Sequence, residues 1–379
     1  MRRLGLWLIL VVVWVGFLPV ALFAQSYHTE QSYIDSFHSF ALNRQNQFRA
    51  SRAFHWIKYR SFTEDILAKW ENFRTSTAKT WIVYDDSLTT RSSVDFESGT
   101  IEIEALIEAD QDSAEVLAKP QIETHLRRIL NEEGPDGNAM LKGQIIPDRA
   151  TPSTAAIDSL IKTSPMEKKP VTAKDRISRI KVSATFALVP DHLRKRAERY
   201  VPIVQRHARR FDLDAALIFA VIHTESYFNP FARSSVAYGL MQLVPSTGSR
   251  AAYEYVYGED RVLTPSDLYE PEKNIELGWG YLAFLRKEIF QSVEEDDKAI
   301  LCAVASYNTG AGNVSRAFTG RKAVHQAIPI IRKMKEEVLY HYLLENLPYE
   351  ETRNYLRRVM GRRSLYVEWR TEQLVHQLR

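Results

Sequence analysis

The feature that most constrains this chain is the stretch of residues 215–222, which is apolar on every face of a helix. A helix that is apolar all round must be buried, so the second half of the chain must build a core around it. Asp212 or Asp214 can cap the first turn of this helix. Pro230 disfavours helical geometry at the residue before it, so we expect the helix to end near Phe228.

Glu225 lies at the far end of this predicted helix, among aromatic neighbours. Burial disfavours the charged form of a carboxyl group, and the negative end of the helix dipole acts in the same direction. A carboxyl group whose pKa is raised in this way stays protonated near neutral pH and can serve as a general acid. On position alone, a solvated glutamate at a helix end is the commoner arrangement.

Upstream of residue 190 the pattern favours strands. Residues 80–84 form a strand-like run, and residues 92–107 alternate polar and apolar around Ser98-Gly99, which predicts a hairpin with one polar face. Residues 181–188 alternate again and predict a last strand of the same sheet. Residues 31–76 contain a long helical pattern, and residues 112–132 are also predicted to form a helix.

These patterns predict two domains. Residues 25–189 should form an α+β domain with a small antiparallel sheet, and residues 190–379 an all-α domain. Residues 147–176 are rich in Pro, Ser, Thr, Ala and Lys, which predicts a linker-like surface loop inside the first domain.

The N-terminus predicts export. Arg2-Arg3 is followed by an uncharged, mostly apolar run to Ala24, so residues 1–24 are either a cleaved signal peptide or a retained anchor. Positive charge before the run places the rest of the chain outside the cytoplasm, and we expect a periplasmic protein with possible membrane association. No cysteine lies near the end of the run, which argues against a lipoprotein.

Composition excludes several classes of protein. The one cysteine, Cys302, cannot form an internal disulfide or a Cys-based zinc or iron–sulfur site, and we expect no metal and no other cofactor. Lys and Arg number 50 against 47 Asp and Glu, a formal net charge of +3. Because this is not the basic excess of a nucleic-acid-binding domain, we expect no nucleic acid partner.

Three later segments end or begin predicted helices, and each one alone is most simply a helix boundary with suitable turn residues. With the residues around the acid they make four short motifs: Glu225-Ser226, Gly239-Leu240-Met241-Gln242, Ser306-Tyr307-Asn308-Thr309-Gly310 and Glu351-Thr352-Arg353-Asn354-Tyr355. In this order they resemble the catalytic domain of the lytic transglycosylase family, which has a lysozyme-like fold related to goose-type lysozyme. Residues 80–84, 92–107 and the approach to Pro190 resemble the N-terminal domain of the C family of membrane-bound lytic murein transglycosylases.

The resemblance implies peptidoglycan glycan strands as the substrate. The β-1,4 bond between N-acetylmuramic acid and N-acetylglucosamine would be cleaved without water to give a 1,6-anhydromuramyl end, with Glu225 as the single general acid and base. After Glu225 no Asp or Glu occurs until Glu254, which suits a one-carboxylate mechanism.

The remaining roles also follow from the resemblance. Ser226 and Gln242 would hydrogen-bond near the acid or the sugar, and Met241 and Tyr307 would line the sugar-binding subsites. Asn308 would orient an N-acetyl group, and Tyr355 would bond to Glu225 or the substrate. Glu351 would stabilise an oxazolinium-like intermediate. Two residues depart from the family pattern: Tyr227 and Tyr238 stand where small or aliphatic residues are usual, and we expect these rings to narrow or redirect the cleft.

Two other functions stay open at this point. A lysozyme-type hydrolase on the same scaffold would need a second carboxylate across the cleft to hold a water molecule. A non-catalytic scaffold that binds peptidoglycan would not need the four intact motifs. His223 should face away from Glu225 and have a structural role, and the basic stretch 353–363 is either a solvated helix face or a contact for acidic groups.

Overall fold

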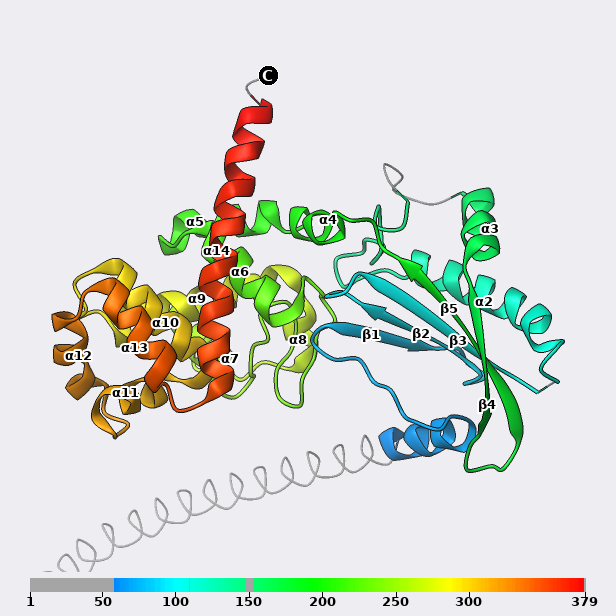
Figure 1. Ribbon diagram of the computed structural model, residues 1–379. Helices are drawn as coiled ribbons and strands as arrows, with labels where there is room; N and C mark the ends of the chain where they lie inside the picture. Colours follow the sequence, from blue (N-terminus) through cyan, green and yellow to red (C-terminus); the bar gives the residue numbers. More distant parts are fainter. Residues whose placement is uncertain (1–57, 109, 147–152, 378–379) are drawn as a thin grey trace, which may run out of the picture. The chain divides into compact units, whose positions relative to one another are not determined.

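The computed structural model describes residues 58–108, 110–146 and 153–377 (Figure 1). The chain divides into two compact units, residues 1–68 and residues 69–379. In the first unit the described residues, 58–68, are helical. The predicted export segment, 1–24, and the helical pattern before residue 58 lie outside the described residues. None of the helices described is long and apolar enough to cross a bilayer.

The second unit begins with a five-stranded sheet in the order β1-β2-β3-β5-β4, and every neighbouring pair is antiparallel. Its strands are β1 (Thr80–Tyr84), β2 (Thr90–Asp95), β3 (Thr100–Ile107), β4 (Met166–Thr172) and β5 (Ser178–Ala187). The predicted hairpin is confirmed, with Val94 opposite Ile101. The small antiparallel sheet expected for the first domain is therefore present.

The two faces of the sheet differ, as the alternation in the sequence predicts. Ile101 and Ile103 of β3 are fully buried in a core shared with helix α2 (Ala114–Asn131). On the other face Arg91 donates to Glu104 across 2.6 Å, and both side chains are almost inaccessible. Two buried charges are tolerated here because each neutralises the other.

The prediction of a loop over residues 147–176 is wrong for its described part. Helix α3 (Thr154–Thr163) begins after Ser153, whose side chain accepts a hydrogen bond from the backbone of Ala156, and strand β4 follows. Strand β4 lies at the edge of the sheet and carries Lys168, Lys169 and Pro170. Charges and proline protect an exposed edge from further pairing, so the composition of an edge strand is close to that of a loop.

From residue 190 onward the described chain consists of helices and turns, which confirms the all-α second domain. The helices are α4 (His192–Glu198), α5 (Val201–Phe211), α6 (Ala215–Ser226), α7 (Gly248–Tyr257), α8 (Pro265–Tyr269), α9 (Pro271–Phe284) with the π-helical turn η1 (Leu285–Ile289), α10 (Asp296–Thr309), α11 (Ala311–Thr319), α12 (Val324–Lys333), α13 (Glu336–Asn346) and α14 (Glu350–Gln377).

Helix α6 is the buried helix that the apolar run predicts. Asp214 caps it by accepting a hydrogen bond from the backbone of Ala216, and Leu217 to Ile222 are all buried. The long helix α14 packs along α6 (Figure 1). This pairing brings the C-terminal part of the chain to Glu225.

Candidate active site

Two residues in the left-handed conformation end α6, two and three positions after the candidate acid. Tyr227 has φ 51° and Phe228 has φ 62°. For a residue with a side chain this conformation costs about 1–2 kcal/mol, so surrounding contacts must hold both in place. Phe228 is 1% exposed and stacks on Tyr200 with ring centroids 6.3 Å apart. The turn thus fixes where α6 stops and where the last side chains of the helix point.

Glu225 has the electrostatic environment of a general acid. Burial raises the pKa of its carboxyl group to about 8; nearby Glu351 adds to this rise, whereas Tyr355 and Arg358 oppose it. The side chain is not fully enclosed, because part of its surface stays accessible to solvent. A carboxyl group that is protonated at neutral pH and open on one side can deliver a proton to a bound substrate.

The loop with the second motif is held against the end of α6. Ser226 is buried, and its hydroxyl donates to the carbonyl of Leu240 across 2.7 Å. The backbone of Met241 donates to Oδ1 of Asn274 on α9 across 2.8 Å, and the Met241 side chain is fully buried. Ser226 and Met241 therefore lie behind the site surface and shape it from below.

Glycine at position 239 is required by this loop. Gly239 has φ 78°, and a Cβ atom there would lie 2.2 Å from the carbonyl oxygen of Leu268. Gln242 also has positive φ, 47°, and its amide donates to the carbonyl of Gly239 across 3.0 Å. The loop can thus pass close to α8 and α9 and present Gln242 on its outer side.

The third and fourth motifs meet the other two. The hydroxyl of Tyr307 donates to the carbonyl of Met241 across 2.8 Å, and burial and the nearby carboxyl of Glu225 raise its pKa. Asn308 accepts a hydrogen bond from the hydroxyl of Thr352 on α14 across 2.7 Å. The hydroxyl of Tyr355 is buried and makes no hydrogen bond of standard geometry, but it lies close enough to Glu225 to lower the pKa of that carboxyl.

A pocket of about 300 Å³ lies between the segments of the second and third motifs. Tyr281 and Tyr307 supply neighbouring rings whose centroids are 5.3 Å apart. Its lining mixes amide, hydroxyl and aromatic groups, as suits a sugar ring: Gln242, Leu243, Val244, Thr247, Gly248, Tyr281, Tyr307, Asn308, Thr309 and Gly310. The structure thus brings Gln242, Tyr307 and Asn308 together, and places Glu351 on the exposed side of α14 near the acid.

Three contributors were not identified in the sequence. Asn274 holds the loop of the second motif, but charged residues lie close to it in the chain, so the sequence gives no signal of its burial. Thr352 lies inside the fourth motif but had no assigned role. Arg362, counted only as part of a basic stretch, donates to the carbonyl of His223 in the last turn of α6. No local pattern identifies a contact of that kind.

The expectation that Tyr227 narrows the cleft is wrong. Its hydroxyl donates to Glu97, in the turn between β2 and β3, across 2.5 Å, and its ring belongs to the core of the sheet domain. A backbone in the left-handed region turns this side chain away from Glu225. Tyr238 packs edge-on against Tyr269 with centroids 5.7 Å apart.

His223 is buried and has the structural surroundings that the sequence predicts. Its Nδ1 lies 3.0 Å from the hydroxyl of Tyr366, and burial lowers its pKa to about 3, so it is neutral. Among the described residues, no group of three or more His, Cys, Asp or Glu is arranged to hold a metal ion.

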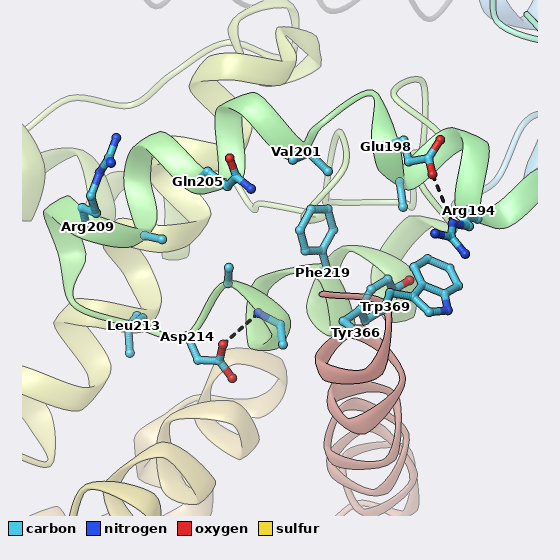
Figure 2. Close-up of a pocket in the computed structure, with 14 residues that line it drawn as sticks. Arg194, Glu198, Val201, Gln205, Arg209, Leu213, Asp214, Phe219, Tyr366 and Trp369 are labelled. Atoms are coloured by element: carbon cyan, nitrogen blue, oxygen red, sulfur yellow. Dashed lines mark hydrogen bonds and ion pairs between the residues drawn. The ribbon is translucent and has the colours of Figure 1, made fainter. Parts of the chain in front are cut away.

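Another pocket, of about 440 Å³, lies at the opposite end of α6 (Figure 2). Asp214, Phe219 and Trp369 contribute to its lining. Glu225 lies ten positions after Ala215 along the helix, a rise of about 15 Å, so this pocket is not part of the site around the acid.

Comparison with protein families gives two matches. Residues 202–328 match the Transglycosylase SLT domain, and residues 47–131 match the N-terminal domain of membrane-bound lytic murein transglycosylase C. The chain is 32% identical over 309 residues to the membrane-bound lytic murein transglycosylase C of Edwardsiella ictaluri, and covers 82% of that protein with 76% of its own length. The corresponding protein of Serratia proteamaculans is 31% identical over 307 residues, with the same coverage.

Similar solved structures include an inactive mutant of the lytic transglycosylase Slt from Pseudomonas aeruginosa, with 26% identity and a TM-score of 0.35 over 45% of this chain. The 70 kDa soluble lytic transglycosylase from Escherichia coli has 24% identity and a TM-score of 0.36 over 47% of this chain. The matched region spans about a quarter of the length of each of those proteins, 24% and 26%.

Proposed function

Because this chain belongs to the membrane-bound lytic murein transglycosylase C family, we propose that it is a peptidoglycan-cleaving enzyme that leaves 1,6-anhydromuramyl ends. The substrate is the β-1,4 bond between N-acetylmuramic acid and N-acetylglucosamine. The observation that carries the proposal is the Glu225 carboxyl group, whose pKa burial raises to about 8. It lies close enough to Tyr307, a lining residue of the pocket, to raise the pKa of that phenol.

Glu225 acts first as an acid. Its proton goes to the glycosidic oxygen as the bond from that oxygen to C1 of the muramyl residue breaks. The carboxylate then takes the proton from the muramyl 6-hydroxyl while that oxygen forms a new bond to C1. The same side chain thus gives up a proton and takes one back, and no water is consumed. General acid–base assistance of this kind contributes about 10²–10⁴ in rate.

The other groups bind and orient in this scheme. Gln242, Tyr307 and Asn308 line the pocket and hold the sugar next to the acid. Tyr355 lies close enough to Glu225 to favour its carboxylate form, so it lowers the pKa of that carboxyl. Ser226 and Met241 lie behind the surface of the site and hold its loop in place through their hydrogen bonds to Leu240 and Asn274.

The products of sacculus digestion test this proposal. We expect mass spectrometry to show muropeptides one water lighter than those that lysozyme releases. Glu225→Gln should lower kcat by about 10²-fold or more, because Gln cannot transfer the proton. Glu254→Gln, at an exposed carboxylate of α7, is the matched control and should retain wild-type turnover. Hydrated reducing ends as the sole product would overturn the proposal.

One observation keeps a hydrolase as the second candidate. Glu351 lies close enough to Glu225 to raise its pKa, so a second carboxylate is near the acid. If Glu351 held a water molecule for attack on C1, the products would carry hydrated ends. The same spectra therefore decide between the two functions.

We further propose that the enzyme works in the periplasm. The support is the predicted export segment, 1–24, and the family's membrane-bound relatives. Fractionation should place the protein with the cell envelope, and recovery only in the cytoplasm would contradict this.

A further inference from the structure

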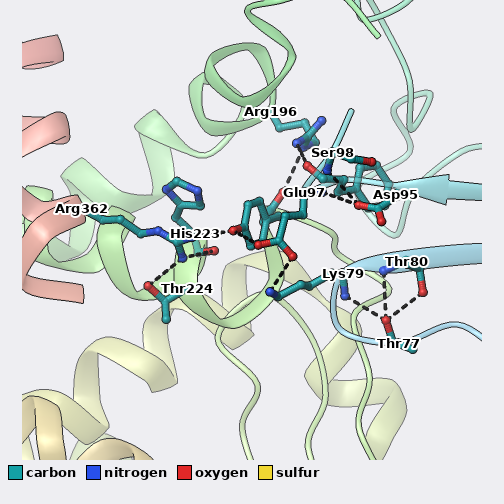
Figure 3. A network of polar contacts seen from close by, with 12 residues as sticks. Thr77, Lys79, Thr80, Asp95, Glu97, Ser98, Arg196, His223, Thr224 and Arg362 are labelled. Carbon is teal, nitrogen blue, oxygen red and sulfur yellow. Dashed lines mark hydrogen bonds and ion pairs between the residues drawn. The ribbon is translucent and has the colours of Figure 1, made fainter. Parts of the chain in front are cut away.

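A chain of polar contacts runs from the sheet domain to the end of α6. Nζ of Lys79 donates to one carboxylate oxygen of Glu97 across 2.7 Å, and the hydroxyl of Tyr227 donates to the other across 2.5 Å. Arg362 of α14 donates to the same hydroxyl across 2.5 Å. We call Lys79, Glu97, Tyr227 and Arg362 the polar junction (Figure 3).

Arg362 extends the polar junction to the turn of helix that carries the acid. Its Nη1 lies 3.1 Å from both the carbonyl of His223 and the hydroxyl of Thr224 (Figure 3). Carbonyls in the last turn of a helix lack partners within the helix, and a guanidinium is a suitable donor for them. The residue before Glu225 is therefore fixed by a side chain that also binds Tyr227.

The ring and the backbone carbonyl of Tyr227 both contact residues of other elements. Its ring packs edge-on against His223 with centroids 4.8 Å apart, and the cationic groups of Lys79 and Arg362 lie 5.0 and 4.8 Å from its centroid. Its carbonyl accepts a hydrogen bond from Arg196 across 3.0 Å, and Arg196 also donates to the carbonyl of Phe96 in the sheet domain across 2.8 Å. Both domains thus determine the left-handed turn two residues after Glu225.

We propose that the sheet domain positions the acid: Glu97, acting through Tyr227 and Arg362, fixes the last turn of α6 and so aims the Glu225 carboxyl at the glycosidic oxygen. This inference rests on the proposed function. Glu97 and Tyr227 are positioning residues, because their side chains contact the end of α6 and not the sugar pocket. Such a role affects the transition state more than ground-state binding, so it is measured in kcat and not in KM.

The competing explanation is that the polar junction only holds two domains together. It would then contribute to stability without any effect on turnover. The chain offers a matched control, because Tyr257 donates to Glu276 across 2.5 Å and Arg210 binds the same carboxylate. That tyrosine–glutamate–arginine set joins α7 to α9 and α5 within the helical domain.

The test compares the full chain with Tyr227→Phe, Glu97→Ala, Glu97→Gln and the control Tyr257→Phe. Rates are measured on sacculi and thermal unfolding is followed in parallel. We expect Tyr227→Phe and Glu97→Ala to lower kcat about 10–100-fold, the range that follows from a misplaced catalytic group, with KM within about twofold of wild type. Glu97→Gln keeps an acceptor for the Tyr227 hydroxyl and should recover part of the lost rate. Tyr257→Phe should keep wild-type kcat.

The double variant Tyr227→Phe with Glu97→Ala should be no slower than the slower single variant, because both remove the same contact. The inference is overturned if both single variants keep kcat within about twofold of wild type, or if Tyr257→Phe loses as much rate as they do. Glu97 is exposed, so its variants test the inference even if Tyr227→Phe does not fold. A wild-type chain that does not cut sacculi would instead refute the proposed function.

Discussion

Glu225 is placed where its charge is unfavourable to the fold. The pKa of its carboxyl is about 8 in the folded chain against an ordinary value of 4.5. Because the folded-state pKa is the higher one, the folded state keeps a proton that the unfolded state loses as the pH rises. The free energy of unfolding should therefore fall between about pH 4.5 and pH 8 on account of this residue.

Replacing Glu225 by Gln should remove this cost. We expect Glu225→Gln to stabilise the protein by about 1–3 kcal/mol at pH 7, and to have almost no effect at pH 4, where both states are protonated. Chemical denaturation at the two pH values measures the difference. An equal effect at both would mean that the carboxyl group is already ionised in the folded state. The sequence predicted a raised pKa for Glu225 from burial and the helix dipole, and a contact with Tyr355 from the family resemblance. It did not predict that Glu351 and Arg358 would shift this pKa.

Helix α14 carries two charged residues that shift the pKa of Glu225, in addition to Tyr355. Glu351 in its first turn raises the pKa of Glu225, and Arg358 two turns later lowers it. Both are exposed side chains, so either can be changed without opening the core.

The two substitutions should therefore shift the activity profile in opposite directions. In the proposed mechanism Glu225 must be protonated to act, so we expect kcat to fall as the pH rises through its pKa. Glu351→Gln should move this fall to lower pH, and Arg358→Gln should move it to higher pH. The measurement is kcat against pH at low ionic strength, and added salt should shrink both shifts. Shifts in the same direction would show that these charges do not act on Glu225 in the assembled site.

At the level of elements, periodicity predicted most of the structure. The apolar run gave α6 with its cap and its end, and the alternation at residues 92–107 gave the hairpin. It failed for α3 and β4, because an exposed edge strand and a short surface helix bury too few side chains to make a pattern. The four motifs led to the site, but their spacing did not show that Ser226 and Met241 lie beneath it.

Arg196 on α4 joins the two domains of the second unit. It is 2% exposed and donates to the carbonyls of Tyr227 and Phe96 and to the side chain of Gln144. Burial lowers its pKa to about 9, so its charge is costly and is retained for these three hydrogen bonds. Long-range contacts of this kind join residues far apart in the chain and leave no local trace in the sequence.

Arg196→Leu should leave three buried oxygens without their donor. We expect the free energy of unfolding to fall by about 1–4 kcal/mol, because each oxygen left without a donor destabilises the folded state. Removing the charge also removes the energetic cost of burying it, which offsets part of this loss. Denaturant unfolding gives the value. Arg209→Leu, at an exposed position of α5, is the control and should stay within about 0.5 kcal/mol of wild type. A similar small change for Arg196 would contradict the role described for it.

The contact between Glu97 and Tyr227 also has a consequence for recombination. A chimaera that takes its strands from one parent and its helices from another inherits the carboxylate and the phenol from different sources. Such hybrids should cleave peptidoglycan at the parental rate only when Glu97 and Tyr227 come from the same parent. The sheet domain and the helical domain therefore cannot be exchanged independently between relatives without loss of activity, even though each has its own hydrophobic core.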